Sequence, residues 1–317
     1  MSTTLTRETS RAPRRRPAHV ASPARQPAAP STGVRVALVQ SRSAVGTETF
    51  DPRDENLERA LDAIKAAADE GAKLVVFGEM YLSGYRTDEW LHKWASHPDS
   101  SDRHVAALER AAKDLNVHVV MGAGTFGAHI PGDIYDSALL VGPTGLIGVY
   151  RKVHVAAFPY EKGLSMERCF YSPGRELNVF DTAIGKLGIH ICYDMHFPEV
   201  PRVQALQGAE ILINVSAGAD GFQDYWDHFS YIRAVENASW YLVCSVVGDQ
   251  RGDRLFGGSR ILDPSGTAVA AAMNDEEDIL IGDVDLLVAR NVRTQAHTFN
   301  LRQPDAYSAI AAPRAYP

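Results

Sequence analysis

Short apolar runs alternate with amphipathic stretches from Val34 onward, and this pattern predicts strands and helices in turn. The expected helices are "RDENLERALDAIKAAADEGAK", "SDRHVAALERAAKDLNV", "PEVPRVQALQGA" and "DYWDHFSYIRAVENAS". The expected strands are "VRVALVQ", "LVVFGEM", "HVVMGAGTF", "GKLGIHIC", "EILINVS", "WYLVCSVVG" and "DILIGDVD". Strands that are apolar throughout are typical of sheets covered by helices, so the pattern predicts an α/β fold.

Two segments with Gly and Pro turns change this picture from a purely parallel sheet to a mixed one. They are "IYDSALLVGPTGLIGVYRK" and "GGSRILDPSGTAVAAA", which are typical of β-hairpins. No fixed-period repeat and no linker interrupts the sequence after residue 33. We therefore expect one domain over residues 34–305. Residues 306–317 are expected to form a C-terminal tail, because this end of the chain is polar and contains proline.

The first 33 residues differ from the rest in composition. The stretch "RAPRRRPAHVASPARQPAAPSTG" is rich in Arg, Pro and Ala and contains no acid. It resembles a twin-arginine or organellar leader, yet it has no apolar core, and its prolines would break an amphipathic helix. Residues 1–33 are therefore expected to be a disordered basic tail.

Charge and cysteine content narrow the function classes. The formal net charge of -7 argues against a nucleic-acid-binding surface. No stretch is long and apolar enough to cross a membrane, so no membrane partner is expected. The three cysteines, Cys169, Cys192 and Cys244, show no paired spacing. This disfavours a disulfide framework or a structural zinc site, and a reducing, cytoplasmic location is the default expectation.

Three reactive side chains stand where apolar runs stop. Glu79 follows "LVVFG", Lys152 follows "LIGVYR" and Cys192 follows "KLGIHI". Each has an ordinary structural explanation when it is taken alone: a turn cap, a solvated strand end and a small core residue. Together they form a coherent set for acyl transfer. A thiol needs activation to attack at neutral pH, a carboxylate can move protons, and an ammonium can favour the thiolate and stabilise an oxyanion.

The segments around these residues resemble the signatures of a known family. "VVFGEMYLSGY", "YRKVHV" and "GIHICYDMHFPE" are similar, in order and separation, to the three signature segments of the nitrilase superfamily, the carbon–nitrogen hydrolases. "GAEILINVSAG", "RAVENASWYLV" and "GGSRILDPSG" are also similar to family segments. The resemblance covers residues 34 to 305. It implies a four-layer αββα sandwich, subunits that associate as homodimers or larger homo-oligomers, and no metal or organic cofactor.

The resemblance also implies roles for the reactive residues. Cys192 would be the nucleophile, Glu79 the general base, and Lys152 the oxyanion stabiliser together with the backbone N–H of Tyr193. The family usually has a second glutamate between the Lys and Cys segments. Glu167 fits the spacing to "SPG" better, and Glu161 fits the spacing of some amidases. Glu167 would orient Lys152, and a thioester would form and then be hydrolysed.

The residues after Cys192 bear on the substrate. "CYD" resembles the amidase and carbamoylase branches more than true nitrilases, which often carry "CWE". Relatives that act on N-carbamoyl amino acids have arginines where this chain has Met195 and His196, so the same capture of a substrate carboxylate is doubtful. Arg302 lies in a C-terminal run that resembles the carbamoylase tail. The expected substrate is a linear amide or an N-carbamoyl (ureido) compound, and nitrile hydrolysis is the alternative.

Candidate pocket residues are Tyr85, Tyr193, His196 and Phe197, with Phe222 and Trp226 more simply explained as a packing face. Other functions stay open at this point. His190 could pair with Cys192 as in a cysteine protease, and His190, Cys192 and His196 could hold a metal ion, although their spacing is unusual. A non-catalytic binding protein with this fold is the third alternative. The helix near Pro198 to Gly208 and the C-terminal tail are the expected dimer contact.

Overall fold

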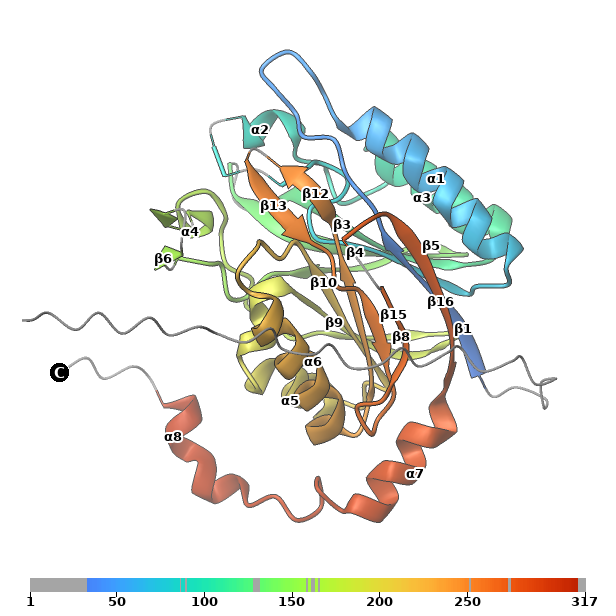
Figure 1. Cartoon of the computed structure of the whole chain (residues 1–317), viewed down its shortest axis with the longest axis vertical. Coiled ribbons are helices and arrows are strands. Elements are labelled where there is room, and N and C mark those ends of the chain that lie inside the picture. Colours follow the sequence, from blue (N-terminus) through green and yellow to red (C-terminus); the bar gives the residue numbers. More distant parts are fainter. Residues whose placement is uncertain are drawn as a thin grey trace, which may run out of the picture. The chain divides into compact units, whose positions relative to one another are not determined.

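Two mixed sheets of six strands each carry the fold (Figure 1). The computed structural model describes residues 33–312 except 86, 89, 128–131, 158, 161–162, 165, 251 and 273–274. The first sheet has the order β16-β1-β2-β3-β4-β5, and the second has the order β15-β14-β11-β10-β9-β8. Strands β1, β2 and β3 run parallel to one another, as do β9, β10 and β11, and the outer strands of both sheets pair antiparallel.

The apolar runs of the sequence form the central strands. The first sheet contains β1 (Gly33–Gln40), β2 (Leu74–Phe77), β3 (His118–Phe126), β4 (Ile134–Gly142), β5 (Gly145–Arg151) and β16 (Asp278–Asp285). The second contains β8 (Val179–Thr182), β9 (Gly185–Ile191), β10 (Ile211–Ser216), β11 (Trp240–Ser245), β14 (Arg260–Leu262) and β15 (Ala268–Ala271). Two hairpins add β6 (Pro159–Tyr160) with β7 (Gly163–Leu164), and β12 (Val247–Gln250) with β13 (Asp253–Phe256).

Helices cover the outer face of each sheet, which gives four layers. On the first sheet lie α1 (Arg53–Asp69) and α3 (Arg103–Leu115), whose Ile64 and Leu108 join a buried apolar cluster with Val75 of β2. On the second lie α5 (Glu199–Leu206) and α6 (Gln223–Asn237), and Trp226 and Ala234 of α6 pack in another cluster. The largest cluster lies between the sheets and is formed by side chains from both. The architecture is therefore the expected four-layer αββα sandwich.

Some elements were not evident from the sequence. They are α2 (Leu91–Trp94), α4 (Glu167–Phe170), α7 (Leu286–Ala296), α8 (Ser308–Ala311), η1 (Cys192–His196) and η2 (Pro304–Tyr307). The predicted N-terminal tail lies outside the described residues up to position 32, and Gly33 already belongs to β1. At the other end, η2 and α8 lie on the surface, with Leu301 and Ile310 largely exposed.

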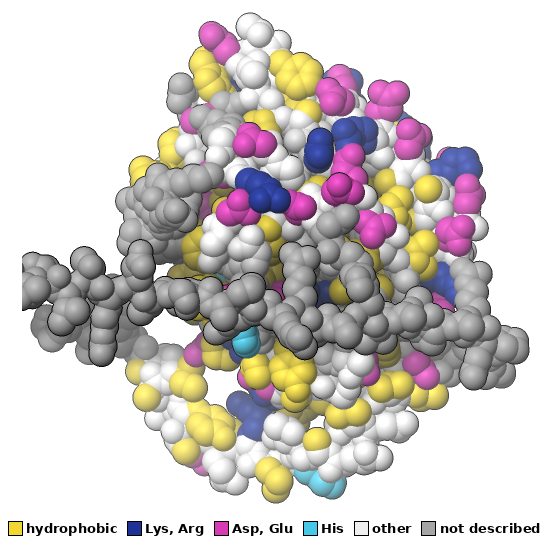
Figure 2. Space-filling view, viewed as in Figure 1, with side chains coloured by type: hydrophobic (Ala, Val, Ile, Leu, Met, Phe, Trp, Pro, Cys, Tyr) yellow, Lys and Arg dark blue, Asp and Glu magenta, His cyan; other side chains and the backbone are white. Residues whose placement is uncertain are grey.

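The surface carries both signs of charge. Figure 2 shows acidic and basic side chains interspersed over the region of α1.

Among the described residues, no helix combines the length and apolar character needed to span a membrane.

Candidate active site

The ends of three strands bring the predicted reactive residues together. Glu79 lies two residues beyond β2, Lys152 directly follows β5, and Cys192 directly follows β9. The Lys152 Nζ atom lies 2.6 Å from Glu79 Oε1 and 2.8 Å from Glu167 Oε2. Cys192 and Glu167 line the same pocket. Residues that are far apart in the sequence therefore meet where the two sheets abut, and Glu167, the preferred candidate for the second glutamate, contacts Lys152.

The turn that carries Glu79 is wedged between the sheets. The Glu79 N–H donates to the Ser216 carbonyl at 3.2 Å. A Cβ on Gly78 would lie 2.7 Å from the backbone N of Val246, and a Cβ on Gly122 would lie 2.1 Å from the Gly78 carbonyl oxygen. Glycine is therefore required on both sides of the turn. This close packing fixes the position of the Glu79 backbone.

Cys192 stands at a strained turn. Its φ of 47° lies in the left-handed region, which is unfavourable for a residue with a side chain. The Asn214 side chain donates to the Cys192 carbonyl at 3.3 Å and helps to hold this conformation. Such strain gathers at functional positions, and here it displays the thiol at the start of η1 rather than in the core.

Asp194 ties the Cys192 turn to the strand that carries Lys152. Its Oδ1 accepts from the backbone and ring nitrogens of His154 at 2.9 and 2.8 Å, and its Oδ2 accepts from the Tyr150 hydroxyl at 2.8 Å and the Ile191 N–H at 3.1 Å. Burial would raise the pKa of Asp194, but the hydrogen bonds from His154 and Tyr150 outweigh it and lower the pKa. No motif in the sequence marks this buried carboxylate as part of the site.

The Lys152 ammonium is enclosed by three buried acids. Besides Glu79 and Glu167 it faces Asp136 of β4, whose Oδ2 is 3.3 Å away. Burial disfavours the charged form of Lys152, but Glu167, Glu79 and Asp136 outweigh it and raise its pKa well above the usual range. These acids have the spacing of a metal-binding group. The ammonium lies within 3.3 Å of each of them and takes the place that a cation would occupy.

The Cys192 thiol is held in its neutral form. Burial raises its pKa well above the usual range, and the Glu79 carboxylate adds to this effect, whereas Lys152 and the backbone N–H of Ala217 act in the opposite direction. Lys152 favours the thiolate as expected, but burial and the neighbouring carboxylates outweigh this single ammonium, so the net direction of the pKa shift is upward. A base must remove the thiol proton during attack.

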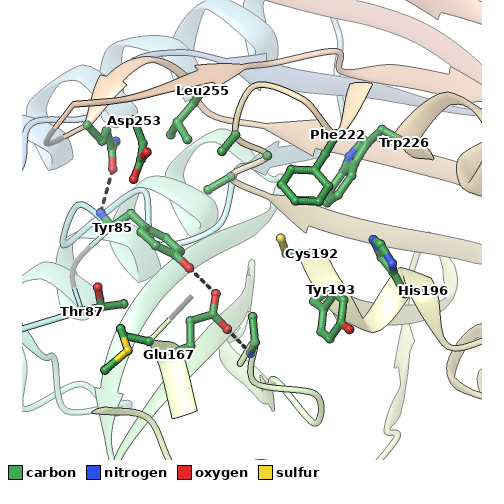
Figure 3. Close-up of a pocket in the computed structure, with 16 residues that line it drawn as sticks. Tyr85, Thr87, Glu167, Cys192, Tyr193, His196, Phe222, Trp226, Asp253 and Leu255 are labelled. Atoms are coloured by element: carbon green, nitrogen blue, oxygen red, sulfur yellow. Dashed lines mark hydrogen bonds between the residues drawn. The ribbon is translucent and has the colours of Figure 1, made fainter. Parts of the chain in front are cut away.

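A pocket of about 140 Å³ opens onto Cys192. In Figure 3 the Cys192 sulfur points into it, with Phe222 and Trp226 on one side and Tyr193 and His196 on the other. The remaining lining residues are Tyr85, Thr87, Ala156, Met166, Glu167, Ala217, Gly218, Ala219, Gln250, Asp253 and Leu255. The pocket walls therefore come from loops and short helices that follow strands of both sheets, from the start of α6 and from the β12–β13 hairpin.

Tyr85 connects this pocket to the charge cluster. Its hydroxyl donates to Glu167, and the dashed line in Figure 3 marks this hydrogen bond. Burial and the Glu167 charge raise the pKa of Tyr85 well above its usual range, so the phenol keeps its proton. Glu167 also accepts from the backbone N–H of Ala156 at 2.7 Å. Its carboxylate is thus fixed between Tyr85, Ala156 and Lys152.

Comparison with known proteins decides the family. The model of the carbon-nitrogen hydrolase family matches residues 35–294. The chain belongs to the carbon–nitrogen hydrolases of the nitrilase superfamily. It is 33% identical to a nitrilase of Pyrococcus abyssi over 82% of this chain and 93% of that protein, and 27% identical to human omega-amidase NIT2 over 87% and 98%. The solved structure of Saccharomyces cerevisiae Nit3 is 30% identical, with a TM-score of 0.73 over 83% of this chain and 94% of that one.

In this carbon–nitrogen hydrolase most predicted pocket residues line the pocket, and one does not. Tyr85, Tyr193 and His196 line it, whereas Phe197 does not. The prediction for Phe197 is corrected: its ring stacks on His154 with centroids 3.6 Å apart, because the Asp194 contacts hold His154 beneath the end of η1. Glu161 lies outside the described residues.

The alternatives that involve His190 do not fit this carbon–nitrogen hydrolase. The ring nitrogens of His190 contact Gln204 at 3.0 Å and the Tyr241 hydroxyl at 2.7 Å. Burial lowers the pKa of His190 to about 4, so it is neutral. Both ring nitrogens are thus hydrogen-bonded to Gln204 of α5 and Tyr241 of β11. Neither is available to activate Cys192 or to bind a metal ion together with His196.

Proposed function

We propose that this carbon–nitrogen hydrolase cleaves an uncharged linear amide or N-carbamoyl (ureido) compound through a thioester on Cys192. The observation that carries the proposal is the arrangement of Lys152 between Glu79 and Glu167, beside a pocket into which the Cys192 thiol points. This arrangement holds a nucleophile, a base and an oxyanion partner without histidine or metal participation.

In the first half-reaction Glu79 takes the thiol proton while the sulfur attacks the substrate carbonyl carbon. The electron pair of the carbonyl bond moves to oxygen, and Lys152 with the Tyr193 backbone N–H stabilises that oxyanion. The oxyanion then re-forms the carbonyl as the C–N bond breaks. Glu79 returns its proton to the leaving nitrogen, which departs as ammonia or an amine.

In the second half-reaction Glu79 deprotonates a water molecule that attacks the thioester. The tetrahedral intermediate collapses, the C–S bond breaks and the sulfur regains a proton from Glu79. The product is a carboxylic acid from an amide, or a carbamate that loses CO₂ from a ureido substrate. Glu167 orients Lys152 throughout, because its two oxygens are fixed by Lys152, Tyr85 and Ala156.

The pocket lining favours an uncharged substrate. Its described residues include the acids Glu167 and Asp253 but no Lys or Arg. Burial and the neighbouring Arg233 lower the pKa of His196 to about 4, so its ring is neutral at physiological pH. Arg302 lies against a different cleft. Among the described lining residues, a substrate carboxylate would meet acids and a neutral imidazole rather than a guanidinium fork.

Nitrile hydrolysis is the second candidate, because the Pyrococcus abyssi relative bears the name nitrilase. A nitrile carbon could be attacked by the same thiol, and the thioimidate would be hydrolysed in the same pocket. The site thus offers one nucleophile for both chemistries, and turnover assays distinguish them.

The test is ammonia release from a matched panel: butanamide, succinamate, an N-carbamoyl alkylamine, an N-carbamoyl amino acid and butyronitrile. We expect turnover of butanamide or the N-carbamoyl alkylamine, with kcat/KM at least about tenfold above that of the carboxylate-bearing counterpart. Cys192→Ala should abolish turnover, and Cys169→Ala, a matched control at an exposed thiol, should retain it. Equal turnover by Cys192→Ala, or binding without turnover by the wild type, would reject the proposal.

The proposal includes a homodimer or larger homo-oligomer. Exposed apolar side chains gather on α5 and α6: Leu206, Tyr225, Tyr231, Ile232 and Val235. A patch of this kind favours contact with a second copy. Light scattering of the wild type and of an Ile232→Asp variant tests this assembly.

A thiol nucleophile must also remain reduced, which favours a reducing compartment such as the cytoplasm.

A further inference from the structure

A third acid faces the proposed base and has no role in the reaction described above. Asp136 of β4 is 1% exposed, and its Oδ2 lies 3.3 Å from Lys152 Nζ. Glu79 and Asp136 approach each other so closely that, with Glu167, each offers an oxygen within 4.8 Å of the others. The backbone carbonyl of Asp136 also accepts from the Lys152 N–H at 2.9 Å. Asp136 is thus in contact with the site through both its backbone and its side chain.

Three buried oxygen atoms in this cluster lack a hydrogen-bond donor among the described residues. They are Glu79 Oε2 and both carboxylate oxygens of Asp136. Two carboxylates cannot bond to each other, because both only accept. A single proton on Asp136 would supply the missing donor to Glu79. It would also reduce the burial of uncompensated negative charge around one ammonium.

The electrostatic surroundings favour that proton on Asp136. Burial raises the pKa of Asp136 well above its usual range, and the Glu79 charge raises it further, while Lys152 acts in the opposite direction. The titratable groups that face this cluster are Glu79, Lys152, Glu167, Cys192, Tyr85 and Tyr171.

We propose that Asp136 is a neutral acid that donates a hydrogen bond to Glu79 Oε2, thereby orienting Glu79 and keeping it ionised for removal of the Cys192 proton. Asp136 is a positioning residue, since it acts through Glu79 rather than on the substrate. The inference rests on the proposed role of Glu79 as base. It assigns to this third acid a task that neither Glu167 nor Lys152 performs.

The first test compares the pH profiles of Asp136→Asn and Asp136→Leu with the wild type. Asparagine keeps a hydrogen-bond donor toward Glu79, so we expect kcat/KM within about threefold of wild type. The acid limb of the pH profile, where kcat/KM falls at low pH, should lie at the same pH as in the wild type. Leucine removes the donor that stabilises the Glu79 carboxylate. The acid limb should then move upward by about 1 to 2 pH units. Asp181→Asn, on the exposed surface, controls for loss of one negative charge.

If Asp136 were ionised, the acid limb of the pH profile would shift in the opposite direction. Both variants would then remove a negative charge beside Glu79 and would move the acid limb to lower pH, which would overturn the inference. An acid limb that stays in place in Asp136→Leu would overturn it as well, because a merely structural role lowers activity without moving the limb.

The second test does not require turnover. Infrared spectra at neutral pH should show the carbonyl stretch of a protonated carboxylic acid in the wild type and its loss in Asp136→Asn. If that band is present while no amide in the panel is hydrolysed, the proposed function fails and the protonation of Asp136 stands. If the band is absent from the wild type, the inference fails whatever the activity.

Discussion

Replacing Lys152 by methionine tests the charge cluster directly. Lys152 is fully buried and is the cation that faces Glu79, Glu167 and Asp136. Its removal leaves buried acids without their partner, and breaking a buried pair in this way costs about 3–5 kcal/mol of unfolding free energy. Loss of the oxyanion partner should lower kcat by about 10²–10³ or more. Methionine has a similar length, so the loss of charge is the main change.

The stability deficit of Lys152→Met should depend on pH with a defined sign. Without the ammonium, the pKa of a buried acid in the folded state rises above its unfolded value. Such a group stabilises the fold below its unfolded pKa, and this stability is lost as pH rises toward the folded pKa. Each extra proton held on folding changes the unfolding free energy by about 1.4 kcal/mol per pH unit. The deficit should therefore be large near pH 8 and shrink markedly toward pH 5.

Urea unfolding followed by tryptophan fluorescence at several pH values measures this deficit. Lys65→Met is the matched control, because Lys65 forms an exposed pair with Asp69. Its effect should stay within about 0.5 kcal/mol at every pH. A deficit in Lys152→Met no larger than that of the control would refute the reasoning. A deficit that does not change between pH 8 and pH 5 would refute it as well.

Two further predictions concern the supports of the site. Gly122→Ala should lower kcat by more than tenfold, because the new Cβ would press on the backbone of the turn that carries Glu79. Gly124→Ala on the same strand is the control and should keep most activity, because its Cβ would meet only the flexible end of Met80 at 3.2 Å. Equal losses of kcat in the two variants would contradict this prediction. Asp194→Asn should lower the unfolding free energy by about 1–3 kcal/mol near pH 7, because the amide cannot accept all four hydrogen bonds. Since the folded-state pKa of Asp194 is lowered, the difference in unfolding free energy from wild type should shrink as pH falls through that pKa. Urea titrations at several pH values measure this difference, and a difference that stays constant would contradict the prediction.

The strands and the reactive residues could be predicted because their signals are local. Apolar runs such as "LVVF" and "GIHI" lie inside sheets buried on both faces, so nearly every residue is apolar. Glu79, Lys152 and Cys192 interrupt or end such runs and are visible for that reason. The family resemblance supplied the pairing of these residues, and Glu167 contacts Lys152 in the structure.

The other features of the site depend on tertiary packing, which the spacing of residues in the sequence does not predict. Asp136 lies in β4 beside Ser137, just before the apolar run of that strand, and nothing in this local pattern marks its carboxylate as part of the site. The neutral state of Cys192 follows from burial and from acids contributed by other strands. Phe197 was expected in the pocket because it is near Cys192 in sequence, but η1 turns it toward His154. Phe222 and Trp226 could have lined the pocket but were more simply explained as a packing face, and in the structure both line the pocket.

The most direct test of the central claim is detection of the acyl group on Cys192. The protein is mixed with the best substrate of the panel, quenched in acid within the first turnovers, digested and examined by mass spectrometry. We expect the acyl mass on the peptide that contains Cys192, lost on treatment with hydroxylamine and absent from Cys192→Ala. Full hydrolysis by Cys192→Ala, or an acyl group on Cys169 alone while turnover proceeds, would contradict the account.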